Sequence, residues 1–121
     1  MRALRFHGVG RFGLEDAPTP VPGPGEVRVR PIATGICGTD AHILDGSFRS
    51  VPPVILGHEI CGRIDAVGTG VHDIREGDLV TVEPHRFCGL CRYCRTGREH
   101  LCLRKEAWGV HIDGGMAEAV V

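Results

Sequence analysis

Three cysteines separated by two residues each occur in the stretch Cys88-Gly89-Leu90-Cys91-Arg92-Tyr93-Cys94, and a fourth follows at Cys102. Zinc binds four thiolates tetrahedrally at about 2.3 Å, and short gaps allow one loop to supply three of them. Two disulfide bonds are the alternative, but a C-x2-C pair rarely closes into a structural disulfide. The spacing therefore predicts a zinc-binding lobe at about residues 84–105. Because four thiolates fill all the coordination positions, this zinc is expected to be structural.

Basic residues surround the four cysteines, and Glu99 is the single acidic residue among them. Nearby positive charges lower the pKa of a thiol and so favour the thiolate that binds a metal. A basic loop that is simply solvated is the alternative. The basic residues are Arg86, Arg92, Arg95, Arg98, Arg104 and Lys105.

Length and charge limit the classes of protein to be considered. A chain of 121 residues is long enough for one domain with a real core. Its formal net charge of −1 argues against a nucleic acid or a membrane surface as the partner. No apolar run approaches the ~18 residues of a membrane span, and residues 1–6 lack the apolar segment of a secretory signal. Cysteines held as metal ligands fit a reducing compartment, so we expect a cytoplasmic location.

The glycine and proline content predicts a mainly β domain. Eighteen glycines and eight prolines break helices, whereas short strands joined by tight turns tolerate them. A short helix is expected to begin near Gly38, with Thr39 or Asp40 as its cap, and to end at Gly46. About six or seven short strands give a barrel-like pattern. The clearest of them are expected at 1–8, 11–17, 26–36, 60–67, 79–82 and 116–121.

A second set of possible metal ligands lies outside the lobe. Cys37 follows a predicted strand, and His58 and Glu59 follow Gly57 at the edge of another. Thiolate, imidazole and carboxylate are the ligands of catalytic zinc sites, which keep one position open for water or substrate. Judged from the residues alone, such a cysteine is more often a buried apolar residue, and such a histidine a core residue, than a metal ligand.

Two segments resemble the zinc-ligand loops of the medium-chain alcohol dehydrogenases. Gly57-His58-Glu59-Ile60-Cys61-Gly62 is similar to the zinc signature of that family, and Gly35-Ile36-Cys37-Gly38-Thr39-Asp40-Ala41-His42 is similar to its first ligand loop. The spacing of the four cysteines and the segment 114–118 also resemble the family, in the same order along the chain. The resemblance implies a GroES-like β-barrel.

The resemblance also implies a reaction and the roles of particular residues. Cys37 and His58 would bind catalytic zinc, with Glu59 as a direct or exchangeable ligand. Thr39 would hold the hydroxyl proton of a small alcohol substrate, and His42 would deliver that proton to solvent. The cofactors would be Zn²⁺ and NAD or NADP, and the substrate a secondary alcohol or polyol, as in the threonine, polyol and butanediol dehydrogenases. Thr39 as a helix cap and His42 as an exposed helical residue remain the alternatives.

No G-x-G-x-x-G follows a predicted strand, so these 121 residues contain no Rossmann domain. We therefore expect one domain, residues 1–121, which forms the N-terminal catalytic part of a zinc-dependent dehydrogenase and is inactive without a cofactor domain. A stand-alone zinc-binding module with a structural or association role is the alternative. A homo-oligomer is compatible with both hypotheses.

Overall fold

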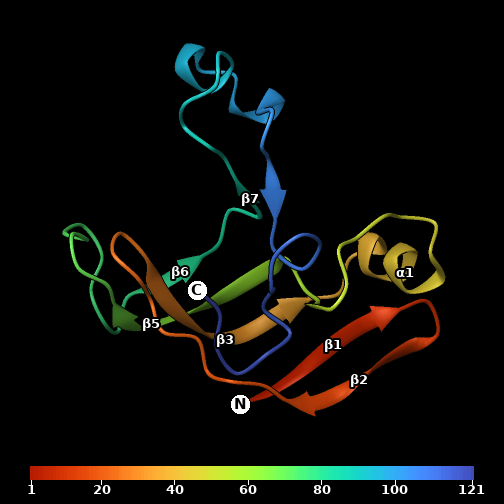
Figure 1. The fold of residues 1–121 in the computed structure, drawn as a ribbon. Coiled ribbons are helices and arrows are strands. Elements are labelled where there is room, and N and C mark those ends of the chain that lie inside the picture. The colour runs from red at the N-terminus through yellow and green to blue at the C-terminus, as the bar shows by residue number, and fades with distance from the viewer.

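Two three-stranded antiparallel sheets and one two-stranded sheet build the molecule (Figure 1). The computed structural model describes residues 1–121. The strand orders are β2-β1-β4, β3-β5-β6 and β7-β8. One α-helix and two 3-10 helices complete the structure. The predicted mainly β class with few short helices is confirmed.

The first sheet is a hairpin with a short third strand. Strand β1 (Arg2–Gly8) pairs antiparallel with β2 (Arg11–Asp16), and β4 (Val54–Ile55) pairs with the other edge of β1. Gly10 in the connecting turn has a φ of 73°, a conformation that favours glycine. The buried face of this sheet contributes to one core cluster, made of Phe6, Ile43, Val54, Leu56 and Val110.

The second sheet carries the longer strands. Strand β3 (Val27–Gly35) pairs antiparallel with β5 (Glu59–Val67), which also pairs with β6 (Leu79–Thr81). Ile60, Gly62 and Ile64 are buried on one face of β5, as the alternating pattern predicts. A Cβ at Gly62 would lie 2.4 Å from the carbonyl oxygen of Arg30, so this close approach of the two strands needs glycine.

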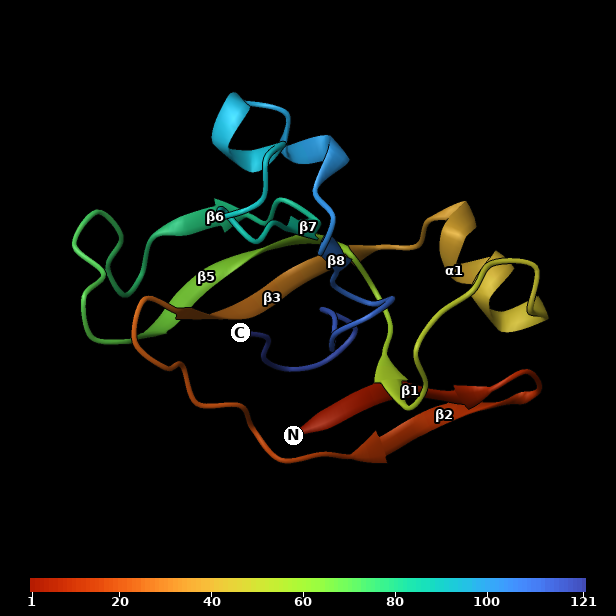
Figure 2. The ribbon, with the colours of Figure 1, turned by 45° about the horizontal axis from the view of Figure 1, so that its top comes forward.

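The last six residues connect the two sheets and do not form the strand predicted at 116–121. Ala117 makes an isolated bridge to Ala3 of β1, and Val120 makes another to Val29 of β3. Figure 2 shows this segment running between the two sheets. A chain that changes partner after three residues cannot build a continuous ladder with either strand, which is why the strand prediction is wrong here.

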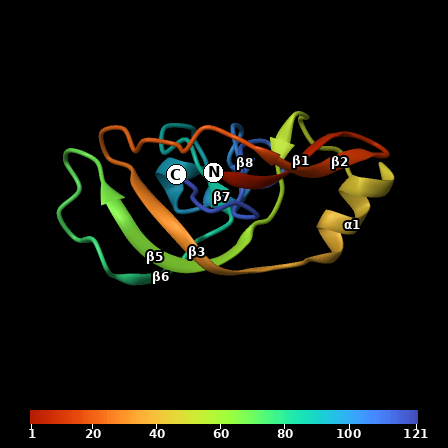
Figure 3. The ribbon, with the colours of Figure 1, turned by 90° about the horizontal axis from the view of Figure 1, so that it is seen from below.

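Helix α1 (Gly38–Asp45) follows β3 directly and lies beside the β1–β2 hairpin, as seen from below in Figure 3. Its N-cap residue is Cys37, two or three positions before the cap expected from the sequence. Asp40 acts from the third helical position, where its Oδ2 accepts the backbone N–H of Cys37 at 2.8 Å. The helix ends at Gly46, which has a left-handed φ of 84°, as predicted. Ile43 is buried against the core of the first sheet.

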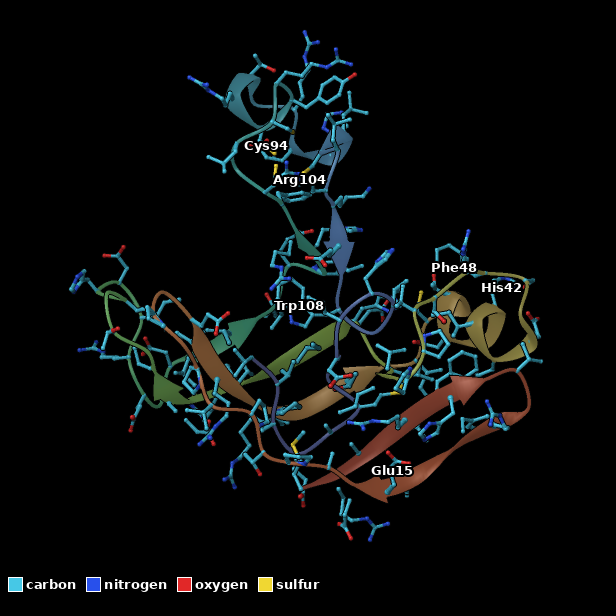
Figure 4. All side chains as sticks on the ribbon, in the orientation of Figure 1. Glu15, His42, Phe48, Cys94, Arg104 and Trp108 are labelled. Atoms are coloured by element: carbon cyan, nitrogen blue, oxygen red, sulfur yellow. The ribbon has the colours of Figure 1, made fainter.

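The cysteine-rich lobe projects away from both sheets (Figure 1). Strands β7 (His85–Arg86) and β8 (Glu106–Ala107) form its antiparallel stem, and two 3-10 helices, η1 (Cys94–Thr96) and η2 (Glu99–Leu101), lie at its tip. Trp108, at the base of the lobe, packs against the core of the second sheet (Figure 4). None of the helices in the structure has the length and apolar character needed to cross a membrane.

Candidate metal centres

The four cysteine sulfurs of the lobe converge on one point. All four Sγ atoms lie within 4.8 Å of one another, and all four thiols are free. The Sγ of Cys94 lies 3.5 Å from that of Cys91 and 3.9 Å from that of Cys88. A regular tetrahedron with metal–sulfur bonds of about 2.3 Å has edges of about 3.8 Å. The sulfurs therefore already have the separation that a zinc ion requires.

Backbone N–H groups, rather than the basic side chains, stabilise the thiolates. The N–H groups of Cys94 and Leu103 lower the pKa of the Cys91 thiol to about 6, and those of Leu90 and Cys91 lower the pKa of Cys88. Burial raises the pKa of the Cys94 thiol to about 12, so its thiolate needs a cation beside it.

The basic side chains at the tip of the lobe are exposed to solvent: Arg92, Arg95, Arg98 and Arg104. Arg104 is exposed near the labelled Cys94 in Figure 4, and its contact with the site is made by its backbone N–H, 3.3 Å from the Sγ of Cys102. Arg92 lies over the ring of Tyr93, 4.7 Å from the ring centroid. The lobe therefore presents its positive charge outward, and folding of the loop brings N–H donors to the sulfurs.

Cys37, His58 and Glu59 form a second group whose ligand atoms also lie within 4.8 Å of one another. Their proximity follows from the pairing of β3 with β5, in which Gly35 lies opposite Glu59. Cys37 and His58 flank this pair and are half-buried, whereas Glu59 is exposed. A Cβ at Gly35 would lie 2.3 Å from Oε2 of Glu59, so glycine leaves the room that this carboxylate occupies.

Asp40 belongs to this site, although the sequence indicated it only as a possible helix cap. Its side chain is buried, and its Oδ1 lies 3.7 Å from Nδ1 of His58. Both atoms are buried without a hydrogen-bond partner. A metal-binding histidine commonly directs its second ring nitrogen at a carboxylate, which fixes the ring and its tautomer. The donor set and these two unpartnered atoms fit a zinc ion held by Cys37, His58 and Glu59.

Thr39 and His42, three residues apart on α1, differ in their surroundings. The Sγ of Cys37 lies 3.7 Å from Oγ1 of Thr39, and Thr39 borders a cleft that His58 also lines. His42 is exposed and lies farther along the helix (Figure 4), where its Nδ1 is 3.0 Å from the hydroxyl of Ser47. The structure thus brings Thr39 to the site and leaves His42 outside it, without a hydrogen bond between the two.

The cleft beside the second site has a volume of about 300 Å³. It lies between the first turn of α1 and the stem of the lobe, so segments far apart in the sequence form its walls. Its lining residues are Thr39, Phe48, His58, Pro84, His85, Lys105, Glu106, Ala107, Val110 and His111.

Comparisons with known proteins agree with this arrangement. The family model described as the alcohol dehydrogenase GroES-like domain matches residues 23–121. The L-threonine 3-dehydrogenase of Pyrococcus abyssi is 46% identical over 112 residues, which are 89% of this chain and 32% of that protein. The sorbitol dehydrogenase of Halalkalibacterium halodurans is 39% identical over 116 residues, covering 95% of this chain and 34% of that protein.

A solved structure shows the same fold. A candidate zinc-binding dehydrogenase from Sinorhizobium meliloti, solved with NADP bound, has a TM-score of 0.94 and 45% identity to this chain, and the match covers 98% of this chain and 35% of that one. The chain therefore spans about a third of the length of the proteins it matches. This chain belongs to the zinc-dependent alcohol dehydrogenase family and contains its GroES-like domain.

Proposed function

We propose that this chain is the N-terminal catalytic domain of a zinc-dependent, NAD(P)-linked dehydrogenase that oxidises a secondary alcohol or a polyol. The observation that carries the proposal is the convergence of Cys37, His58 and Glu59 beside a cleft that Thr39 also lines. Relatives named as threonine 3-dehydrogenase and sorbitol dehydrogenase support the substrate class, because both names denote substrates with a secondary hydroxyl group.

In this proposal Cys37 and His58 hold the catalytic zinc ion, and Glu59 is a direct or exchangeable third ligand. Bound zinc would supply a Lewis acid that lowers the pKa of an alcohol hydroxyl, and NAD(P)⁺ would supply the acceptor for the hydride from the carbinol carbon. Asp40 holds the His58 ring in the orientation that presents its other nitrogen to the metal. The exposed position of Glu59 is consistent with a ligand that exchanges.

The hydroxyl proton of the substrate leaves through Thr39. Its side chain lies in the first turn of α1, next to Cys37 and open to the cleft, so it can accept a hydrogen bond from a bound alcohol. His42 is the proposed outlet to solvent. His42 makes its hydrogen bond to Ser47 and none to Thr39, so at least one intervening proton carrier would have to connect the two.

The four cysteines Cys88, Cys91, Cys94 and Cys102 hold a second, structural zinc ion. Four sulfurs leave no coordination position for a substrate. This ion keeps the lobe folded and thereby fixes the β7–β8 stem that forms one wall of the cleft.

The alternative function, a stand-alone zinc-binding module, gives no role to the second site. A buried donor or acceptor without a partner costs about 1–3 kcal/mol, and Asp40 and His58 each contain such an atom. A module used only for association or structure gains nothing from this cost. An enzyme gains from it, because the two atoms lie where they can orient a metal ligand.

Cobalt substitution tests the proposal on this chain. Co²⁺ replaces Zn²⁺ in such sites and has an absorption spectrum that reports its ligands. We expect two Co²⁺ ions per chain, and we expect 1,3-butanediol to change the spectrum of the wild type but not that of Cys37→Ser. A Cys37→Ser chain that still binds two ions, or a wild-type spectrum unaffected by the alcohol, would overturn the proposal.

A further inference from the structure

The backbone of Gly57, the residue before His58, is enclosed by two other glycines. A Cβ at Gly109 would lie 2.7 Å from the backbone nitrogen of Gly57, and a Cβ at Gly114 would lie 2.1 Å from its carbonyl oxygen. Both of these atoms belong to the backbone and cannot move aside as the end of a side chain can. Residues 109 and 114 therefore have to be glycine for residue 57 to lie where it does.

Hydrogen bonds hold the same two segments together. The consecutive backbone N–H groups of residues 114–116 donate to the carbonyl oxygens of residues 55–57, each at 2.8 Å. Leu56, in the middle of the accepting segment, is 1% exposed. The chain that leads into His58 can therefore shift only if residues 109–116 shift with it.

This enclosing segment is a direct continuation of the lobe stem. Strand β8 ends at Ala107, and Trp108 donates its backbone N–H to the carbonyl oxygen of Pro84 at 3.2 Å. Trp108 lies where the lobe meets the two sheets (Figure 4). Gly109 follows at once and donates its N–H to the carbonyl oxygen of Ile112 at 2.8 Å. The position of Gly109 therefore depends on the position of the stem.

The stem is short and depends on the lobe at its far end. Only two residue pairs form it, His85 with Ala107 and Arg86 with Glu106. An isolated two-stranded ribbon is marginally stable at best in water. Cys88, the first of the four cysteines, follows Arg86 after one residue. A metal ion held by the four sulfurs therefore closes the chain beside the stem and stabilises its pairing.

We propose that Gly109 and Gly114 are positioning residues for His58, and that a metal ion in the lobe thereby raises the metal affinity of the second site. The stem fixes Gly109, and Gly109 fixes the backbone of Gly57, from which the imidazole ligand follows. This inference rests on the proposed function, because it assumes that the second site binds a metal ion. Coupling between two binding sites is reciprocal, so an ion at the second site raises the affinity of the lobe by the same factor.

The coupling is expected to be about tenfold, within the range usual between two sites of one protein. Val110 is buried in the core cluster of the first sheet, and Trp108 packs against the core of the second. The turn that carries Gly109 therefore stays attached to both cores when the lobe holds no ion. A change in the affinity of the second site is expected, rather than loss of that site.

Titration with Co²⁺ measures the coupling. The wild type first receives one equivalent of Cd²⁺, a soft ion that the four-sulfur lobe prefers, and Co²⁺ then fills the second site. A double variant, Cys91→Ser with Cys94→Ser, receives Co²⁺ alone. We expect the second site of the double variant to bind Co²⁺ about tenfold more weakly, with a shifted absorption spectrum. Lower stability by itself would leave the spectrum of the bound ion unchanged.

Gly109→Ala tests the backbone contact with the lobe loaded. Its Cβ meets the backbone of Gly57, so Co²⁺ affinity at the second site should fall about tenfold. Gly10→Ala is the matched control, because Gly10 has the same φ of 73° but its Cβ would meet no atom within 4 Å. It introduces the same backbone strain and should leave the affinity unchanged.

Reciprocity supplies a test that needs no change in the lobe or in the glycines. Cys37→Ser disables the second site, so its lobe should bind Cd²⁺ about tenfold more weakly than the lobe of a wild type saturated with Co²⁺. Equal affinities would overturn the coupling even if Gly109→Ala does not fold.

The outcomes separate this inference from the proposed function. Equal second-site affinities in the loaded wild type and the double variant would overturn the inference and leave the proposed function intact. Equal losses in Gly109→Ala and Gly10→Ala would also overturn it, because strain rather than contact would then be responsible. A wild type that binds no Co²⁺ after one equivalent of Cd²⁺ would overturn the proposed function, and this inference with it.

Discussion

His58 and Asp40 face each other across the second metal site, with Nδ1 of His58 3.7 Å from Oδ1 of Asp40 and neither atom hydrogen-bonded elsewhere. The other carboxylate oxygen of Asp40 accepts the backbone N–H of Cys37 at 2.8 Å. One buried carboxylate therefore contacts the backbone of Cys37 and faces the imidazole of His58. In the proposed zinc site, Asp40 would hold the start of α1 and the start of β5 in register with the metal ion.

Asp40→Asn should weaken zinc binding at the second site by about 10- to 100-fold, the usual effect of removing the carboxylate behind a histidine ligand. Asparagine keeps an oxygen that can accept the Cys37 N–H, so the helix start is preserved. Competition with a fluorescent chelator measures the affinity, and the zinc of the four-cysteine lobe serves as the internal reference. Unchanged affinity at both sites would show that Asp40 only caps the helix.

Gly35→Ala should lower metal affinity at the second site with little effect on the melting temperature. The new Cβ would lie 2.3 Å from Oε2 of Glu59, the end of a flexible and exposed side chain, and 3.1 Å from its Cβ, so the carboxylate must move away while the two strands need to separate only slightly. Gly38→Ala is the matched control, because its Cβ would meet no atom within 4 Å. Calorimetric zinc titration of both variants checks the prediction. Equal affinities in the two would argue that Glu59 is not a ligand.

Removal of the lobe zinc should unfold the lobe before the rest of the domain. Cys94→Ser is expected to bind one zinc ion fewer than the wild type, because its thiol is one of four that converge within 4.8 Å. Hydrogen exchange of the amides that contact sulfur, such as Cys88 N–H and Arg104 N–H, should speed up by orders of magnitude. Retention of slow exchange after chelation, with sulfur–sulfur bonds detected by mass spectrometry, would contradict the metal assignment.

The ion pair between Arg28 and Asp65 should contribute about 1 kcal/mol of stability that disappears in acid. The hydrogen bond from Nε of Arg28, at 2.7 Å, holds the pKa of Asp65 below its usual value. A group with a lowered folded-state pKa stabilises the protein above its unfolded pKa of about 3.9 and stops doing so as the pH falls through the lower folded value.

Melting of Asp65→Asn and the wild type across pH values checks this ion pair. The difference in melting temperature should be largest near neutral pH and should disappear as the pH falls through the lowered folded-state pKa of Asp65. Loss of zinc in acid affects both proteins alike, so the difference between their melting temperatures reports the contribution of the Asp65 carboxylate alone. A difference that is independent of pH would show that the amide disturbs packing instead.

Local spacing predicted the lobe, whereas the second site depended on a resemblance. Cys88, Cys91 and Cys94 are close in sequence, so their convergence requires only turns. Cys37 and His58 meet because β3 and β5 pair in the register that sets Gly35 opposite Glu59, and no pattern of residues determines that register.

Other features could not be predicted from the sequence, in one case because the same residue serves two purposes. Aspartate near the start of a helix is typical of an ordinary cap, so the second contact of Asp40, with His58, had no signal of its own. A strand was expected at residues 116–121, but the sequence contains no information on a change of partner from Ala3 to Val29. The cleft was equally hidden, since Lys105 and His111 border the same cavity as Thr39 only in the folded chain.

Turnover should require a dinucleotide-binding domain that these 121 residues do not contain. A hydride acceptor must lie within about 3.5 Å of the carbinol carbon, and such positioning accounts for about 7–11 kcal/mol of a barrier. Its loss costs more than a factor of about 10⁵ in rate. The isolated chain should therefore show no measurable oxidation of a secondary alcohol with NAD⁺ or NADP⁺, followed as absorbance of the reduced nicotinamide.

A protein that joins this chain to a dinucleotide-binding domain should be active, and its variants should rank by their distance from the reacting atoms. Cys37→Ser should abolish turnover, because it removes a proposed metal ligand. Thr39→Val should lower kcat by about 10²- to 10⁴-fold, the usual contribution of a positioned proton acceptor. His42→Ala should have a smaller effect, since the ring is exposed and solvent can replace it. Turnover by the 121-residue chain alone at an ordinary enzymatic rate, or equal losses for Thr39→Val and His42→Ala, would contradict the proposed path of the proton and hydride.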